Sequence, residues 1–423
     1  MATFEIACGF KGGHTFPRNL TRFGPLGGGL TADPQATENR VQVRIRSSYT
    51  LANMYVRVLV STSVNVPLRS RVNGANGALL VTVTADTTGA FQDTVNSDSL
   101  VTGDLVNFSV VSPGPVDGGI SVSLVGFTMV NASGDDTVLV SNSSVDTGYT
   151  QAGGLTRYQG VAGTINTGVT TESDTQYTVR TSSSLTNFRV FVVANAIAGT
   201  VTARTRVNLG NGAQSVSITA SGTGSFEDTT NTDSVVAGDE INYETVTPVT
   251  LSTLTWYMFQ VKSASEARQM AFGYSAGISL SADRFEPIEG GGSTDVSDAE
   301  LSNQIAARST WLARNLFVNV ITHGATSGVD FTLRKNTAAS VSTVNVPQNN
   351  TGFFEDTTNT VPFVSTDLYN YHVDHGAGAG SIVFTLIGIE NGPVGGGGRG
   401  YPSQIFNRRP RKSGRVTQGL RVP

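Results

Sequence analysis

Apolar and polar residues alternate along most of this chain. In Ile120-Ser121-Val122-Ser123-Leu124 every second residue is apolar, which is the pattern of a half-buried β-strand. Phe188, Val190 and Val192 have the same period, and so do Ile382, Phe384 and Leu386. Clusters of Asn, Gly, Asp and Thr separate these runs at intervals of roughly 8–12 residues, as in sandwiches and barrels. The pattern predicts an all-β chain built from sandwiches or barrels.

A unit of about 130 residues occurs three times, which is the signature of a repeat architecture. Each copy contains Arg-x-Asn, a strand, and then Thr-Gly-x-Phe-x-Asp-Thr-x-Asn, beginning at Arg71, Arg206 and Arg334. Upstream, Arg46, Arg180 and Arg308 occupy corresponding positions. We therefore expect three tandem β-sandwich repeats over 1–129, 130–263 and 264–392. The first would carry a Gly/Pro-rich N-terminal arm (1–35), and residues 393–423 would form a basic Gly/Arg-rich assembly arm.

One short segment could be helical instead. Val296–Arg308 includes Ser297-Asp298-Ala299-Glu300, which could cap a turn or two of helix. The corresponding positions in the other copies, Gln42–Arg46 and Gln176–Arg180, have the pattern of a strand, so both alternatives stay open.

The Thr-Gly-x-Phe-x-Asp-Thr-x-Asn segment is the strongest signature in the chain. We expect the glycine to supply a turn, the phenylalanine to fill the core, and the aspartate to accept hydrogen bonds from backbone two residues on. The alternative is a calcium loop, because Asp228, Asn231, Asp233 and Asp239 carry hard oxygen ligands. In the third copy Val361 occupies the position of Asp233, so one of these ligands is missing there, which favours the turn. The hallmark residues are Phe91, Asp93, Asn96, Phe226, Asp228, Asn231, Phe354, Asp356 and Asn359.

This repeated pattern resembles segments of virion proteins of tailed bacteriophages, with jelly-roll sandwiches of the tumour-necrosis-factor and complement type. The resemblance covers 35–60 residues of each copy, by the extent of the repeat. It implies a trimer-like arrangement and a non-enzymatic role in capsid decoration, a head fibre or a tail component. One chain with three copies would form a pseudo-threefold trimer by itself, with apolar faces of the sandwiches meeting at the axis. The rival arrangement is a linear string of domains. The alternative function is a glycan-binding adhesin or receptor-binding module of a tail fibre.

Composition and charge limit the kinds of partner and the location that we expect for this protein. Charged residues make up 14% of the chain, well below the roughly 25% of ordinary soluble proteins. No apolar run approaches the ~20 residues that cross a bilayer, Cys8 is the single cysteine, and no secretory signal is visible. We therefore expect a protein made in a host cytoplasm and located in the virion, with no membrane partner.

The C-terminal arm differs in charge from the rest of the chain. Residues 393–423 hold seven basic residues and no acidic one, so the net charge of −4 leaves −11 on the rest. We expect the arm to bind other virion proteins or another copy, rather than nucleic acid, because its apolar residues would not bind a phosphate backbone. The arm residues expected to matter are Arg399, Tyr401, Phe406, Arg408, Arg409, Arg411, Lys412 and Arg415.

Candidate chemistry is sparse. No nucleophile elbow, phosphate loop or dinucleotide fingerprint is present in the sequence. His372 and His375 are three residues apart in a segment of strand-like period. Residues three apart on a strand face opposite sides, which disfavours binding of one metal ion by both. Trp256 and Trp311 could stack on a sugar but are more typical of a core. We expect no enzyme activity, no cofactor and no metal.

Overall fold

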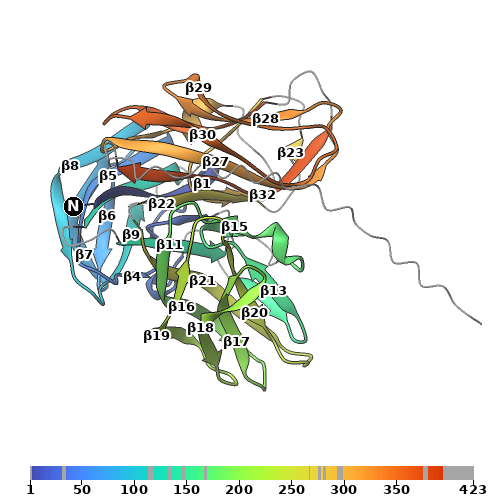
Figure 1. The fold of residues 1–423 in the computed structure, drawn as a ribbon. Helices are drawn as coiled ribbons and strands as arrows, with labels where there is room; N and C mark the ends of the chain where they lie inside the picture. The colour runs from blue at the N-terminus through green and yellow to red at the C-terminus, as the bar shows by residue number, and fades with distance from the viewer. Residues whose placement is uncertain are drawn as a thin grey trace, which may run out of the picture.

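The computed structural model describes residues 2–30, 35–112, 119–131, 136–143, 148–165, 169–265, 267–274, 278–279, 283–292, 299–374 and 380–393. In these residues the chain forms six sheets, arranged in three pairs. Figure 1 shows the pairs as three lobes, blue for the first, green for the second and orange for the third. The prediction of an all-β chain made of sandwiches is confirmed.

The first domain spans residues 2–131. One of its sheets has the order β3-β1-β10-β5-β8 and the other β2-β9-β6-β7, with β4 paired to β9. Four strands from each sheet follow the two-Greek-key path of a jelly roll. Its elements are β1 (Ala2–Phe16), β2 (Leu20–Gly24), β3 (Gly28–Leu30), η1 (Glu38–Arg40), β4 (Val43–Arg44), β5 (Tyr49–Val60), β6 (Val66–Val72), β7 (Ala75–Val83), β8 (Gly89–Leu100), β9 (Leu105–Ser112) and β10 (Ile120–Asn131).

The second domain, within 136–264, repeats this order as β14-β11-β21-β16-β19 and β13-β20-β17-β18. Its elements are β11 (Asp136–Ser143), β12 (Tyr149–Ala152), β13 (Thr156–Gln159), β14 (Gly163–Ile165), η2 (Glu172–Asp174), β15 (Tyr177–Thr178), β16 (Ser183–Asn195), β17 (Val201–Val207), β18 (Gly210–Ile218), β19 (Gly224–Val235), β20 (Glu240–Val246) and β21 (Thr253–Ala264).

The third domain, within 268–393, has the sheets β25-β22-β32-β27-β30 and β24-β31-β28-β29. Its elements are β22 (Arg268–Tyr274), β23 (Ile278–Ser279), β24 (Arg284–Glu286), β25 (Gly290–Gly292), α1 (Glu300–Asn303), β26 (Ile305–Ala306), β27 (Trp311–His323), β28 (Val329–Lys335), β29 (Ala338–Val346), β30 (Gly352–Phe363), β31 (Leu368–Asp374) and β32 (Ser381–Pro393). Strand for strand, the three domains have one topology.

The predicted N-terminal arm, residues 1–35, is wrong. This span contains β1, β2 and β3, and β1 lies inside its sheet between β3 and β10. Ala2 pairs with Asn131 and Phe16 with Ile120, so β1 uses its backbone groups in the sheet as an interior strand must. Strand β10 also runs to Asn131, past the predicted boundary at 129.

The alternative of a helix over Val296–Arg308 is largely wrong as well. Its described part holds only the four-residue α1, and β26 follows directly. Ile305 pairs with Tyr369 of β31, so extended pairing takes over where the helix would have continued. The matching segments of the other domains are the single turns η1 and η2.

The asparagine of the Arg-x-Asn motif forms the tight hairpin that joins the next two strands. Asn73, Asn208 and Asn336 have φ of 52°, 52° and 51°, and the residue after each also has positive φ. Two successive positive φ values define the type I′ turn, which matches the twist of a hairpin. Only the first domain has glycine, Gly74, at the second position; Leu209 and Thr337 adopt that conformation elsewhere.

Burial departs from the predicted half-buried pattern. In β10, Ser121 and Ser123 are buried like Val122 between them, because the third domain packs on the outer side of that sheet. Trp256 and Trp311 are buried in their cores, as predicted. The phenylalanines Phe91, Phe226 and Phe354 are only half-buried, because β8, β19 and β30 are the edge strands of their sheets. No helix in the described residues is long and apolar enough to cross a membrane.

Candidate functional site

The three domains touch in a closed cycle. Strands β3, β14 and β25 lie against one another at the centre. Each also contacts the first strand of the following domain: β3 contacts β11, β14 contacts β22, and β25 contacts β1. The third domain therefore contacts the first in the same sense as the first contacts the second. We call this arrangement the ring, and it is not a linear string.

Glycine is needed where each central strand begins. Gly28, Gly163 and Gly290 occupy equivalent positions and have φ of 78°, 83° and 134°. A Cβ on Gly28 would lie 2.0 Å from Oδ1 of Asn142 in the next domain. A Cβ on Gly290 would lie 3.0 Å from the Cα of Gly9. A side chain at these positions would meet both a forbidden backbone region and a steric clash.

An arginine from each domain reaches the next around the ring. Arg46 pairs with Glu227 of the second domain at 2.6 Å. Arg180 pairs with Glu355 of the third domain. Arg308 of the third domain donates to Gln92 of the first, which is the only uncharged acceptor of the three. These acceptors follow the hallmark phenylalanines directly in sequence. The motif therefore carries an interface residue that sequence reasoning missed, although the three arginines were already visible at matching spacing.

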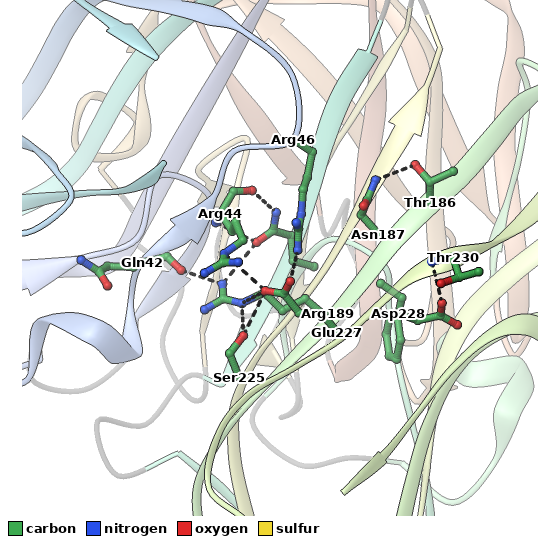
Figure 2. Close-up of polar contacts among 12 residues, drawn as sticks. Gln42, Arg44, Arg46, Thr186, Asn187, Arg189, Ser225, Glu227, Asp228 and Thr230 are labelled. Carbon is green, nitrogen blue, oxygen red and sulfur yellow. Dashed lines mark hydrogen bonds and ion pairs between the residues drawn. The ribbon is translucent and has the colours of Figure 1, made fainter. Parts of the chain in front are cut away.

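The contact between the first and second domains is a cluster of three arginines around one glutamate (Figure 2). The Glu227 carboxylate lies 2.6 Å from Arg46 and 3.4 Å from both Arg44 and Arg189. Arg189 also donates to the backbone carbonyl of Gln42 at 2.8 Å. Burial raises the pKa of Glu227, but the hydrogen bond from Arg46 and the three positive charges outweigh it, so the pKa is lowered. Burial lowers the pKa of Arg189 to about 10, against the opposing effect of Glu227.

The contact between the third and first domains encloses two carboxylates. Glu5 accepts hydrogen bonds from the backbone of Arg308 and Ser309 and, at 2.6 Å, from the hydroxyl of Tyr369. Glu289 is paired at 2.5 Å with Arg268, which is 1% exposed. Burial raises the pKa of both Glu5 and Glu289, against the lowering effect of these partners.

Three further contacts lie at the third–first interface. Arg268 donates to the backbone carbonyl of Glu5 at 2.8 Å. The backbone N–H of Ala7 donates to Glu289 at 2.5 Å. The guanidinium of Arg308 lies 4.1 Å from the centre of the Tyr55 ring, a cation–π distance.

The contact between the second and third domains is more aromatic. Tyr177 packs against Phe317, with ring centres 5.1 Å apart, and its hydroxyl lies 3.2 Å from Glu390. Glu390 is also paired with Arg314 at 3.2 Å. Burial raises the pKa of Glu390 despite these partners. The expectation that apolar faces of the sandwiches meet at the axis therefore needs correction, because buried ionic and hydrogen-bonding groups lie at all three contacts.

The hallmark aspartates bind their own turns. Asp93 accepts from the backbone N–H of Val95 and Asn96, both at 3.1 Å, and from the Asn96 side chain at 2.9 Å. Asp228 and Asp356 make the corresponding bonds within their own turns, to Asn231 and Asn359 among others.

Two further contacts recur beside these turns. Arg71 forms a two-pronged pair with Glu38 at 2.9 and 3.0 Å, and Arg206 and Arg334 do the same with Glu172 and Glu300. The asparagine of each Arg-x-Asn motif bonds an aspartate 31 residues on, at 2.7 Å in every domain. The motif residues therefore hold each sandwich together internally.

The candidate calcium ligands Asp233 and Asp239 accept hydrogen bonds from protein groups. Asp233 accepts from Thr205, Ala213 and Gln214, and Asp239 accepts from Asn208 and Val236. His372 stacks on Phe285 and lies 3.4 Å from Asp283. Within the described residues no group of three or more His, Cys, Asp or Glu is arranged to hold a metal ion.

Other predicted site residues lie outside the described part of the chain. His375 is one of them. So are the arm residues Arg399, Tyr401, Phe406, Arg408, Arg409, Arg411, Lys412 and Arg415. Only Pro393 of the predicted arm is described, as the last residue of β32.

The topology defines the chain as a protein of three jelly rolls. No family model matches the sequence, and no curated protein matches it. A solved structure reported as "The Triple Jelly Roll Fold and Turret Assembly in an Archaeal Virus" is 12% identical over 91% of this chain and 90% of its own, with a TM-score of 0.18. One reported as "Life in the extremes: atomic structure of Sulfolobus Turreted Icosahedral Virus" is 10% identical over 82% and 79%, with a TM-score of 0.17. At such TM-scores, the jelly-roll assignment rests on this chain's own strand order.

Proposed function

We propose that this protein is a non-enzymatic structural component of a virus particle. The observation that carries the proposal is the ring, in which one chain arranges three jelly rolls around a pseudo-threefold axis. Jelly rolls are the architecture of many capsid proteins. A trimer-like building block is also what the resemblance of the repeat implies. The finer proposal is capsid decoration, a head fibre or a tail component of a tailed bacteriophage.

The arm of residues 394–423 supplies the second part of the proposal. With seven positive charges against −11 on the rest of the chain, it would attach the ring to an acidic surface of another virion protein or another copy. Such exposed ion pairs weaken with salt, because charges are screened beyond about 8–10 Å at physiological ionic strength.

The test is incorporation into particles. The full chain and a variant ending at Pro393 are expressed during infection by the virus that encodes the protein, and purified particles are analysed by mass spectrometry. We expect a fixed copy number for the full chain and loss of the truncated chain. Absence of the full chain from particles would overturn the structural role. Normal incorporation of the truncated chain would overturn the role of the arm.

A further inference from the structure

The third domain differs from the other two at the line where two edge strands of each domain meet, which we call the seam. In each jelly roll, two edge strands from opposite sheets meet side by side: β7 with β8, β18 with β19, and β29 with β30. In the first domain, Asp98 on β8 accepts from the backbone N–H of Ala78 on β7 at 2.6 Å. In the second domain, Asp233 accepts from Ala213 at 2.5 Å. A carboxylate therefore closes the seam by binding a backbone donor of the edge strand.

A second aspartate strengthens this closure in both domains. Asp93 accepts from the N–H of Leu80 at 2.8 Å, and Asp228 from that of Ser215 at 2.9 Å. The strands also approach closely at Gly77 and Gly212. A Cβ on Gly77 would lie 2.2 Å from the Ser70 hydroxyl oxygen and 2.6 Å from the Asp98 carboxylate.

The third domain lacks these features. Val361 replaces the aspartate that closes the seam, and its side chain has no oxygen to accept the N–H of Val341. Asp356 bonds Thr358 and Asn359 in its own turn, and among the described contacts it makes no bond across to β29. Ser340 stands where the other domains have glycine. Two edge strands therefore meet here without the carboxylate ties.

A groove of about 490 Å³ opens at this seam. Its apolar lining comes from Ala338, Ala339, Val341, Val361 and Pro362, and Val341 is 67% exposed. Lys335, which also lines the groove, is paired with Asp367 at 2.9 Å. An edge strand beside apolar side chains can accept an extended peptide as an added strand, which supplies backbone bonds and fills the groove.

The end of β32 lies close to this groove. Pro393 pairs with Trp311, and Trp311 pairs on its other side with Phe363, which follows Pro362 in β30. Two strand spacings of 4.7–4.9 Å separate Pro393 from Phe363, or roughly 10 Å. The eight residues from Pro393 to Tyr401 can span about 26 Å when extended. A segment that begins at Tyr401 can therefore reach the groove of its own third domain.

We infer that Tyr401–Phe406 binds in this groove as an added strand, within the same molecule. The segment reads Tyr-Pro-Ser-Gln-Ile-Phe and carries three of the few large apolar residues after Pro393. Proline favours an extended conformation at the tyrosine before it. The basic residues that follow, from Arg408 onward, are then presented from a fixed place on the third domain. This inference does not depend on whether the protein is a virion component.

Disulfide trapping in the full chain tests the inference. Val341→Cys is combined with Ile405→Cys, and the dilute protein is oxidised with copper phenanthroline. The matched control combines Ile405→Cys with Ala213→Cys, the equivalent position on the closed seam of the second domain; Cys8 is buried in both. We expect an intramolecular link between 341 and 405, identified by peptide mass spectrometry, in at least tenfold higher yield than in the control. Equal yields, or links only between molecules, would overturn the inference.

A second measurement avoids the introduced cysteines. Hydrogen exchange is followed in the full chain and in the double variant Tyr401→Ser with Ile405→Ser, both changes lying after Pro393 in the sequence. We expect the backbone amides of β29 to exchange several-fold faster in the variant, while those of β18 are unchanged. Unchanged exchange in β29 would contradict docking of the segment.

Discussion

The hallmark turn and the domain interface are formed by residues that are adjacent in sequence. The contacts of the turn are the same in all three domains, whereas those of the interface differ. Asp93, Asp228 and Asp356 bind the same backbone groups of their own turns in all three domains. The residue just before each aspartate points to a neighbouring domain and changes from Gln92 to glutamate. A local turn can be repeated unchanged, because its partners lie two or three residues away.

Equivalent interface positions show how much the ring contacts differ. Tyr55, Arg189 and Phe317 occupy the same place on β5, β16 and β27, paired beside the hallmark turn. Tyr55 receives a guanidinium, Arg189 pairs with a carboxylate, and Phe317 packs against an aromatic ring. The turns therefore specify each sandwich, and the interfaces specify which domain lies beside which.

The largest effect is expected at the interface between the third and first domains. Arg268→Ala leaves Glu289 buried without its charge partner, and breaking such a pair costs about 3–5 kcal/mol. The free energy of unfolding, measured with guanidinium chloride, should fall by that amount. The combined change Arg268→Met and Glu289→Leu should recover most of it, because an apolar replacement removes both charges. A loss below 1 kcal/mol for Arg268→Ala, by this measure, would show that the pair is not buried.

A smaller effect is expected at the turn. Asp228→Ala removes an acceptor used by Ser215, Thr230 and Asn231, and bonds to a charged group contribute about 1.5–3 kcal/mol. We expect a loss of about 2–3 kcal/mol from the second domain in urea unfolding.

Asp356→Ala tests the same turn in the third domain, where the described contacts of Asp356 include none across to β29. Its cost should therefore be about 1 kcal/mol smaller. Thr230→Ala, an exposed change in the same turn, is the control. Equal losses for the two aspartate variants would contradict the difference between the seams.

The two regions should also respond to pH in opposite directions. Asp93 and Asp228 have pKa values below 3.8, because hydrogen bonds outweigh the raising effect of burial. Their stabilisation is present above pH 3.8 and is lost as pH falls through the lowered pKa. Burial raises the pKa of Glu5 above 4.5 despite Tyr369 and Arg308. Its contribution is therefore full below pH 4.5 and is lost as pH rises through the raised value.

Glu5→Gln isolates the interface part of this pH dependence. Urea unfolding of the wild type and the variant is compared between pH 3 and pH 8. We expect the wild type to lose stability relative to the variant as pH rises above 4.5, because the variant has no carboxylate to ionise. Parallel curves for the two proteins would contradict the assignment of a raised pKa to Glu5.

The smallest effect concerns a turn that differs only in the third domain. Thr366 has φ of 84° where Gly103 and Gly238 have φ of 102° and 101°. A β-branched residue is strained in this region, so Thr366→Gly should raise the melting temperature slightly, with a gain of about 1 kcal/mol or less. Gly238→Thr should produce a loss of similar size in the second domain. A destabilising Thr366→Gly would show that the threonine side chain contributes more than its backbone costs.

The sequence by itself determined the sandwiches. Period-two alternation, the Asn-Gly hairpin at Asn73 and the repeated turn aspartates depend on neighbours along the chain, so they can be identified without coordinates. The same reasoning failed for residues 1–35, where glycine and proline suggested an arm, because β1 is fixed by pairing with β10, more than a hundred residues away.

Only the tertiary structure decided how the sandwiches meet. Arg46 and Glu227 are 181 positions apart in the chain, and no period relates them, so their ion pair depends on the ring. The burial of Glu5 and Arg268 likewise requires the third domain to return to the first. The alternation of apolar and polar residues shows which face of a strand is apolar. It cannot show that a polar face is covered by another domain, because the covering residues are distant in sequence and are matched by shape and charge.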